Sequence, residues 1–484
     1  MVMVIKKEEM SFDINKEKKK ALKISIWEGS GCSVMNGAGG SFITPFALAI
    51  KSSNFQIGFL SSFVGLIGPL AQWGSSHLME KYDRKKIVVY TVLIQSLLWL
   101  PIMFLGLMFF FNIWKTLLPI FLIIFYSLHI GIGAIAGPPW FSWMGDLVPN
   151  KERGRYFGKR NEITQTVLIV SMLVFGFVLD LFKTKGLILT GFTLLFSVSM
   201  FSRLYSSYLF TKQYNPKFKL KRGYYFSFFD FIKHSLGTNF GRFTLFMGLL
   251  HLAVYIASPF FAVYMLDELK LSYTWFTILT ISQTVFSIVF MPFWGKFTDR
   301  YGNRLAILIC CLMIPLVPIL WMFSANKLYL LIVPQLIGGI CWGGFGLATV
   351  NFIYDSAKPE HRALCSTYYN VLVGIGVFIG GIFGGVIAKY TPLDFVAKIL
   401  PGRFASIFLF LFLVSAVTRL IVVLIFLPQI TEVRSVKKPH ILVREHKFVV
   451  GLEHGLKNIN HSFIHGSTLF FNSSQIKKTY KIFR

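Results

Sequence analysis

The chain has 484 residues, of which 54% are hydrophobic and 14% are charged, with a mean hydropathy of +0.62 and a net charge of +28. A soluble domain carries about a quarter charged residues, so this composition excludes an ordinary soluble protein. The basic excess alone would suggest a nucleic-acid partner, and its distribution along the chain decides that question.

Apolar stretches of about twenty residues, the length that crosses a bilayer, recur along the whole chain. They predict twelve helical spans, at 24–49, 57–79, 87–111, 116–140, 162–182, 187–210, 243–266, 274–296, 305–325, 328–352, 363–390 and 404–427. The predicted fold class is therefore an all-α integral membrane protein with twelve transmembrane helices. Residues 1–22 lack the apolar core of a cleaved signal peptide, so we expect the first span to direct its own insertion.

Two of the predicted spans have nearly the same sequence. Residues 195–210 and 411–426 match at seven of sixteen positions, 216 residues apart. Each stretch keeps one arginine, Arg203 or Arg419, inside an apolar run, where a charge is costly. The chain therefore contains two copies of one six-helix unit.

The loops between spans repeat as well. An Asp–six residues–Arg pattern followed by an asparagine occurs twice, as Asp146, Arg153 and Asn161 and again as Asp355, Arg362 and Asn370. The repeat predicts five segments: a cytoplasmic N-terminal segment 1–22, a six-helix bundle 23–210, a cytoplasmic central loop 211–242, a second bundle 243–427 and a basic cytoplasmic tail 428–484.

The positive charge follows the predicted topology. If both termini lie in the cytoplasm, 38 of the 49 Lys and Arg residues fall in cytoplasmic segments and 9 in outside loops. Such a bias is the positive-inside rule with an even number of spans. The charge therefore orients the protein in a membrane, which we take to be the plasma membrane, and places its basic segments against anionic lipid. We expect no nucleic-acid partner.

The most specific local motif is GKFTDRYGNR, between the eighth and ninth spans. Gly295 would let two helices approach closely, Gly302 would permit a tight turn, and Asp299 would pair with a basic residue or cap a helix. Arg300 and Arg304 complete the basic positions of this loop.

This loop resembles the signature loop of the major facilitator superfamily. The equivalent loop of the first half, LMEKYDRKK, is a degraded copy in which Glu80 and Lys81 stand for the Asp-Arg pair and Lys85 for the final basic residue. The Asp146–Arg153 and Asp355–Arg362 pairs resemble further inter-helix loops of that superfamily. The resemblance covers nearly the whole chain, and it implies a monomeric solute carrier that works by alternating access, in a rocker-switch motion, around a cavity lined by spans 1, 4, 7 and 10.

Three titratable residues in the spans are candidates for proton coupling. A carboxyl buried in the membrane, such as Glu28 in the first span, can take up and release protons. Alternatively, Glu28 lies at the cytoplasmic interface and pairs with Arg203, Arg419 or a loop lysine. For His129 and His251 the functional interpretation is that they contact substrate or relay protons, and the alternative is that they are hydrogen-bonded structural histidines.

Seven polar residues on the same or neighbouring spans are candidates for lining the cavity: Asn36, Tyr126, Gln165, Tyr255, Gln335, Asn351 and Asn370. Bonding between helices is the alternative for each of them. As a set they favour a small organic solute that is neutral or weakly charged. Arg203 and Arg419, near the predicted cytoplasmic ends of their helices, are expected to extend to the headgroups or to fix the gate through acidic partners, rather than to bind substrate.

The remaining patterns indicate no enzyme, cofactor or metal site. The glycines of 374–385 contain G-x-G spacing but lie within an apolar span, which predicts a helix-packing surface and not a dinucleotide loop. The five cysteines fall within spans without metal-ligand spacing.

We expect a secondary active or facilitative transporter that is either proton-coupled or uncoupled. The alternatives are a carrier of a lipid-like substrate and a scaffold or sensor that kept this fold and lost transport.

Overall fold

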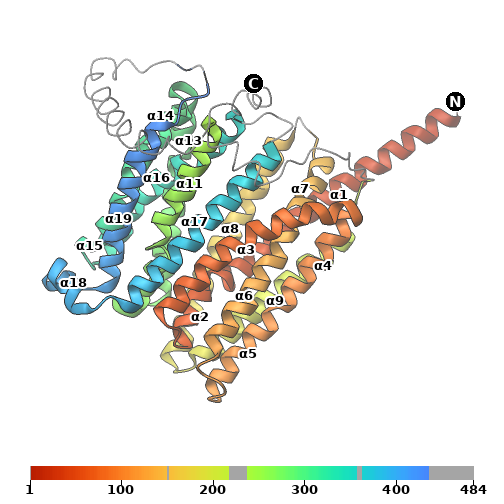
Figure 1. Ribbon diagram of the computed structural model, residues 1–484. Coiled ribbons are helices and arrows are strands. Elements are labelled where there is room, and N and C mark those ends of the chain that lie inside the picture. Colours follow the sequence, from red (N-terminus) through yellow and green to blue (C-terminus); the bar gives the residue numbers. More distant parts are fainter. Residues whose placement is uncertain (1, 150–151, 217–236, 357–361, 435, 437–484) are drawn as a thin grey trace. The chain divides into compact units, whose positions relative to one another are not determined.

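The computed structural model describes residues 2–149, 152–216, 237–356, 362–434 and 436 (Figure 1). Within these residues the structure is helical and has no β-strand, which confirms the predicted all-α class. The helices of the first half are α1 (Val2–Ala38), η1 (Gly40–Phe42), α2 (Ile43–Ala49), α3 (Asn54–Lys81), α4 (Arg84–Leu97), α5 (Trp99–Phe110), α6 (Leu118–Ile135), α7 (Gly137–Leu147), α8 (Arg153–Thr184) and α9 (Ile188–Lys212). Those of the second half are α11 (Asn239–Tyr255), α12 (Phe260–Val263), η3 (Tyr264–Glu268), α13 (Tyr273–Tyr301), α14 (Asn303–Met313), α15 (Leu316–Phe323), α16 (Lys327–Ser356), α17 (Arg362–Tyr390), α18 (Leu393–Ile399), η4 (Gly402–Phe404), α19 (Ile407–Phe426) and η5 (Leu427–Gln429).

Eleven helical segments of the described chain are long and apolar enough to cross a membrane. They extend from α3 to α19 and correspond to the second to twelfth predicted spans. The first predicted span, 24–49, is covered by α1, η1 and α2. Large apolar side chains such as Phe104 and Phe177 are more than half exposed on these helices, as contact with lipid tails requires.

The helices form two compact units. Unit 1 contains Met1–Arg222 together with Pro259–Ile278, and unit 2 contains Gly223–Ser258 and Leu279–Arg484. The division follows the sequence repeat except at Pro259–Ile278, which belongs by sequence to the second repeat but packs within unit 1.

Asp180 of α8 holds this segment at the first turn of α13. Its two carboxylate oxygens accept hydrogen bonds from the backbone N–H groups of Tyr273 and Thr274, each at 2.8 Å. A helix begins with unsatisfied N–H donors and a positive dipole end, and a carboxylate satisfies both. One turn away, Gly176 makes room for α13, because a Cβ there would lie 2.5 Å from the Thr277 hydroxyl.

The fourth predicted span, 116–140, is divided into α6 and α7. Pro138 and Pro139 stand in the first turn of α7, where a missing N–H breaks no hydrogen bond of that helix. The proline pair thus marks a break in the span. The helix resumes there, and α7 continues beyond the prolines and carries Asp146 in its last turn.

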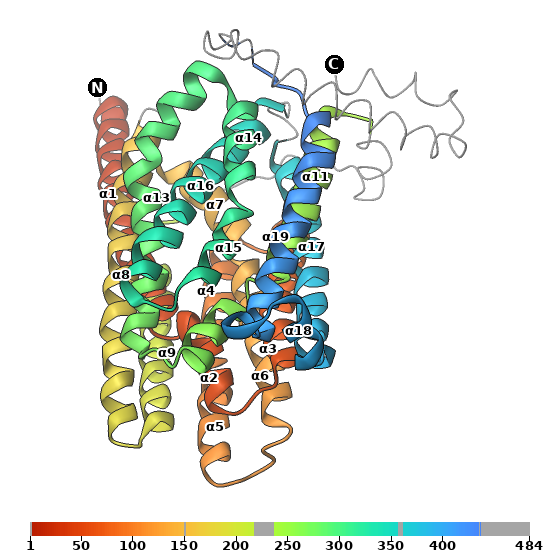
Figure 2. The same ribbon diagram turned by 90° about the vertical axis from the view of Figure 1, so that its left-hand side faces the viewer.

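Glycines bring helices into close contact in both units. In unit 2, α11 and α17 lie side by side in Figures 1 and 2, and a Cβ at Gly376 of α17 would overlap the carbonyl oxygen of Gly248 in α11. In unit 1, a Cβ at Gly37 of α1 would lie 2.6 Å from the side chain of Ser171 in α8. Packing through small residues is how membrane helices associate, and the packing role predicted for the glycines of 374–385 is confirmed at Gly376 of α17.

Candidate functional site

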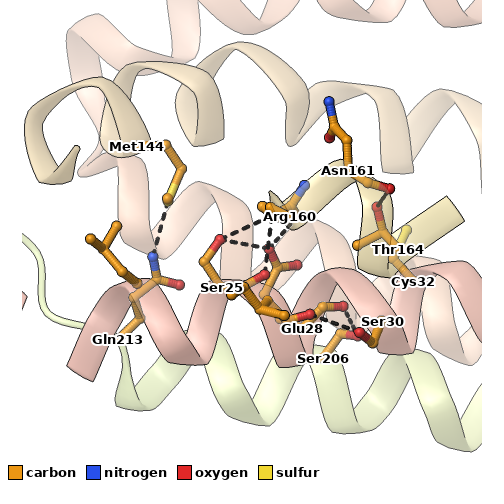
Figure 3. Close-up of polar contacts among 12 residues, drawn as sticks. Ser25, Glu28, Ser30, Cys32, Met144, Arg160, Asn161, Thr164, Ser206 and Gln213 are labelled. Atoms are coloured by element: carbon orange, nitrogen blue, oxygen red, sulfur yellow. Dashed lines mark hydrogen bonds and ion pairs between the residues drawn. The ribbon is translucent and has the colours of Figure 1, made fainter. Parts of the chain in front are cut away.

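A buried ion pair joins α1 to α8 in unit 1. Glu28 is 2% exposed, and its Oε1 accepts a hydrogen bond from Arg160 Nη2 at 2.8 Å. Figure 3 shows Arg160 extending toward Ser25 and Glu28 on α1. A charge removed from water needs a partner of opposite sign at hydrogen-bonding distance, and each of these two groups supplies that partner for the other.

Neighbouring residues fix the geometry of this pair. Arg160 Nε donates to the carbonyl oxygen of Ser25 at 3.2 Å, and the guanidinium lies 4.6 Å from the ring centroid of Trp140 in α7. Ser206 of α9 donates to the backbone carbonyl of Glu28 at 2.8 Å. A Cβ at Gly29 would lie 2.5 Å from Arg160 Nη2, so the glycine makes room for the guanidinium. Residues on α1, α7, α8 and α9 thus hold the pair in place.

A cavity of about 270 Å³ lies at this ion pair. Residues of α1, α4, α6, α7, α8 and α9 form its wall, so it lies within unit 1. Its polar and ionisable lining residues are Glu28, Cys32, Ser33, Trp140, Arg160, Thr164 and Arg203. Three of them, one glutamate and two arginines, carry full charges.

Arg203 reaches the cavity from α9. It is 6% exposed, and its Nε donates to Oε1 of Gln95 in α4 at 2.8 Å. The expected extension of Arg203 to the lipid headgroups is wrong, because the side chain points into the bundle and is covered by neighbouring helices. In addition, its hydrogen-bonding partner is an amide and not an acidic residue of a gate.

Arg419, which occupies the same repeat position in unit 2, is also buried, with 2% exposure. Its guanidinium donates to Ser415 Oγ at 3.0 Å, to the carbonyl oxygen of Ile314 at 3.2 Å and to that of Val254 at 3.3 Å. The expected extension to the headgroups is therefore wrong for Arg419 as well. Protein acceptors surround this guanidinium, which gives it a structural role.

Both candidate histidines have backbone partners and lie outside the lining of this cavity. His129 Nδ1 is 2.9 Å from the carbonyl oxygen of Gln95, and its ring packs against Trp99 at 4.7 Å between centroids. His251 Nδ1 is 2.8 Å from the carbonyl oxygen of Met247, one turn earlier in its own helix. This geometry favours the structural alternative for both histidines.

The seven polar residues expected to line a cavity do not line this one. Asn36 and Gln165 are exposed, and Gln335 is buried at 4% exposure. The other four, Tyr126, Tyr255, Asn351 and Asn370, are partly buried. Asn36 donates to Cys32 Sγ at 3.7 Å, and Tyr126 stacks on His129 at 5.7 Å between centroids.

The loop with the complete motif begins α14 in unit 2. Gly302 has φ +90°, the left-handed conformation that the predicted tight turn requires. Arg304, two residues later, donates its backbone N–H to Glu432 Oε2 at 2.7 Å. The close helix approach expected at Gly295 is wrong, since a Cβ there would meet nothing within 4 Å. Asp299 and Arg300 are exposed.

The equivalent loop of unit 1 holds a buried arginine that the motif did not identify. Arg84 has a fully buried side chain and forms an ion pair with Asp146 at 2.6 Å. Arg153, the expected partner of Asp146, donates instead to the carbonyl oxygen of Gly145 at 2.8 Å. Lys85 donates to the carbonyl oxygen of Gln213 at 2.9 Å. Glu80 and Lys81 are exposed.

Asp355 repeats the arrangement of Asp146 with other partners. It accepts from Arg434 Nε at 2.6 Å and from Asn303 Nδ2 at 2.7 Å. The side chain of Arg362, its expected partner, lies outside the described residues, as do residues 217–236 of the central loop and 437–484 of the tail. In each unit, therefore, an aspartate near a helix end bonds to an arginine distant in sequence.

Sequence reasoning missed Arg160 and Gln95, which hold the charged side chains at this cavity. Arg160 counts as one of the five basic residues of the loop 146–161, although α8 begins at Arg153 and carries it into the bundle. One signal was available: an acidic residue in the first span requires a basic partner, and Arg160 lies two residues before the fifth predicted span.

Comparison with known proteins relates the second half of the chain to a family. A family model described as Major Facilitator Superfamily matches residues 243–475. An uncharacterized transporter of Schizosaccharomyces pombe is 31% identical over 113 residues, which are 23% of this chain and 19% of that protein. The class B tetracycline resistance protein of Escherichia coli is 28% identical over 127 residues, 26% of this chain and 31% of that protein. The matches thus span less than a third of the length of these curated relatives.

Solved structures share the fold over most of the chain. The nucleoside transporter NupG has a TM-score of 0.60 at 15% identity, covering 85% of this chain and 98% of that one. An inward-facing bacterial homologue of the iron transporter ferroportin has a TM-score of 0.61 at 17% identity, with 85% and 98% coverage. Together with the apolar helices, these likenesses indicate an integral membrane protein with the twelve-helix transporter fold. Residues 243–475 thus match the major facilitator superfamily, and the chain as a whole has the fold of these transporters.

Proposed function

We propose that this protein carries a small organic solute across the membrane by alternating access, and that the cavity of unit 1 forms part of its binding site. The observation that carries the proposal is the buried Glu28–Arg160 pair in the wall of a cavity of about 270 Å³. Charged groups inside a membrane bundle are costly, and they mark substrate or ion pathways when they face a cavity.

Glu28 is the proposed coupling residue. A proton on its carboxylate weakens the attraction to Arg160, so proton uptake and release change the contact between α1 and α8. A two-state carrier can use such a change if one state binds the proton more tightly than the other. Names of relatives and fold neighbours refer to tetracycline resistance, to nucleoside transport and to D-xylose–proton symport, which supports transport but does not choose a solute.

We place the protein in the plasma membrane as a monomer, with both termini in the cytoplasm and its basic segments near anionic lipids. The asymmetric distribution of lysine and arginine supports this orientation.

The test is solute flux in liposomes that contain the purified protein and a pH-sensitive dye. The panel holds sugars, nucleosides, amino acids, amphipathic drugs and small carboxylates, each with and without a proton gradient. Glu28→Gln keeps the size of the side chain and removes its charge. Glu162→Gln is the matched control, since it removes an exposed carboxylate from the same bundle.

Solute-dependent proton movement that is lost in Glu28→Gln and kept in Glu162→Gln would support a proton-coupled carrier. Flux without proton movement would support transport and reject the coupling role of Glu28. If folded protein moves no solute of any class, the transport proposal fails, and a lipid-like substrate or a non-transporting role takes its place.

A further inference from the structure

The cavity of unit 1 has an unbalanced charge. Of its three charged lining residues, Glu28 and Arg160 pair with each other at 2.8 Å, and Arg203 remains. The cavity therefore has a net positive charge of one unit. Arg203 is close enough to act electrostatically on Glu28, but the hydrogen bond of that carboxylate goes to Arg160. A buried charge without a counter-charge is destabilising unless water or a ligand compensates it.

The hydrogen-bonding capacity of Arg203 is also incompletely used. A guanidinium has five N–H donors, and Nε of Arg203 donates to Gln95. For the four donors on its two terminal nitrogens, the described part of the chain provides no hydrogen-bond acceptor. Arg160, in comparison, uses Nε and Nη2 within the protein and rests one face on Trp140.

The repeat supplies an internal comparison. Arg419 fills the equivalent position of unit 2, where a hydroxyl and two carbonyl oxygens of the protein accept from its guanidinium. Both arginines are more than nine-tenths buried, at 6% and 2% exposure. Burial alone thus does not explain why Arg203 has fewer acceptors, whereas its position in the cavity wall does.

We propose that the cavity of unit 1 binds a small organic anion, whose carboxylate or similar monoanionic group pairs with the terminal nitrogens of Arg203. The planar guanidinium matches the two oxygens of a carboxylate, and one unbalanced positive charge favours a monoanion. The volume of about 270 Å³ suits a small molecule. This inference rests on the proposed transport function and names its substrate class, and it selects the weakly charged solutes among those that the sequence favoured.

Cys32 provides a reporter inside the cavity. It lines the wall one turn along α1 from Glu28, and it is partly exposed, whereas the other four cysteines of the chain are buried. In the purified full-length protein, Cys32 is labelled with two methanethiosulfonates of similar size, one carrying a 2-sulfonatoethyl group and the other a 2-(trimethylammonium)ethyl group. Each rate is divided by the rate of the same reagent with a free small thiol.

We expect the anionic reagent to be favoured by about tenfold after this normalisation, because the cavity has a net positive charge. Arg203→Gln should remove most of this preference. Arg153→Gln should leave it unchanged, since it removes an equal charge from an exposed site of the same unit. Cys32→Ser should abolish the rapid labelling. No charge preference in the wild-type protein, or a preference that survives Arg203→Gln, would overturn the inference.

A second measurement remains informative if Arg203→Gln does not fold. Acetate, propionate and benzoate are compared with their neutral amides as protectants of Cys32 in the wild-type protein and in Arg203→Lys, which keeps the charge. The acids should slow labelling at concentrations where the amides do not, and equal protection by both, or by neither, contradicts the proposal. Charge-selective labelling without flux in liposomes would reject transport and keep this inference. Flux without charge-selective labelling would keep transport and reject this inference.

Discussion

Glu28 and Arg160 stabilise each other, so removing one of them should cost more stability than removing both charges. Arg160→Leu leaves the Glu28 carboxylate buried without its partner, which should cost about 3–5 kcal/mol of unfolding free energy. Adding Glu28→Gln should recover a large part of that loss, because no unpaired charge then remains. Unfolding in mixed micelles measures both values, and Arg153→Leu is the exposed control. If the losses of the two single variants simply add in the double variant, the two residues do not act as a pair.

At the scale of single residues, the sequence identified the charged positions in the spans but not their partners. Arg203 and Arg419 occupy matching positions in two segments that share seven of sixteen residues, and the shared residues do not distinguish the two arginines. The difference comes from other helices: the backbone of Ile314 accepts from Arg419, whereas the side chain of Gln95 accepts from Arg203. Such partners depend on tertiary packing, so hydrophobic patterning cannot reveal them.

At the scale of helices, the close contact between α11 and α17 predicts that a single methyl group at this interface destabilises the fold. Gly376→Ala places a Cβ against the carbonyl oxygen of Gly248, which backbone movement alone can relieve. We expect a loss of about 1–3 kcal/mol in unfolding free energy. Gly346→Ala in α16 is the matched control, since its Cβ would meet open space. A loss of the same size in both variants would mean that the contact with Gly248 does not set the cost, since alanine by itself favours a helix over glycine.

The spans themselves were predictable because each is a long apolar run, and lipid requires its backbone to be helical. Irregular positions within the spans were harder to place. Pro138 and Pro139 gave the correct signal for a break, but proline at the start of a new helix looks the same in sequence as proline after the end of an old one. The structure shows the first case, and Asp146 consequently lies on a helix beside Arg84.

At the scale of the whole molecule, the repeat predicted two units but not their boundary. Segment Pro259–Ile278 packs within unit 1, and α13 continues from it into unit 2 at Leu279. This assignment depends on long-range contacts such as those of Asp180, which leave no trace in periodicity. If the two units move relative to each other during transport, this segment must either leave unit 1 or bend α13.

The carboxylate of Asp180 therefore sets how firmly unit 1 retains the start of α13. Asp180→Ala removes two charge-assisted hydrogen bonds from Tyr273 and Thr274, and bonds of this kind contribute about 1.5–3 kcal/mol each. We expect amide hydrogen exchange in 259–278 to become at least about tenfold faster, as mass spectrometry of peptides from this segment would detect. Asp267→Ala is the matched control, because its partner Lys270 lies on the same segment in an exposed ion pair. Exchange that stays unchanged in Asp180→Ala, or that accelerates equally in both variants, would show that Asp180 does not hold the segment. Faster exchange in Asp180→Ala alone would mean that a single side chain controls the release of this segment, which is one of the two routes to relative motion of the units.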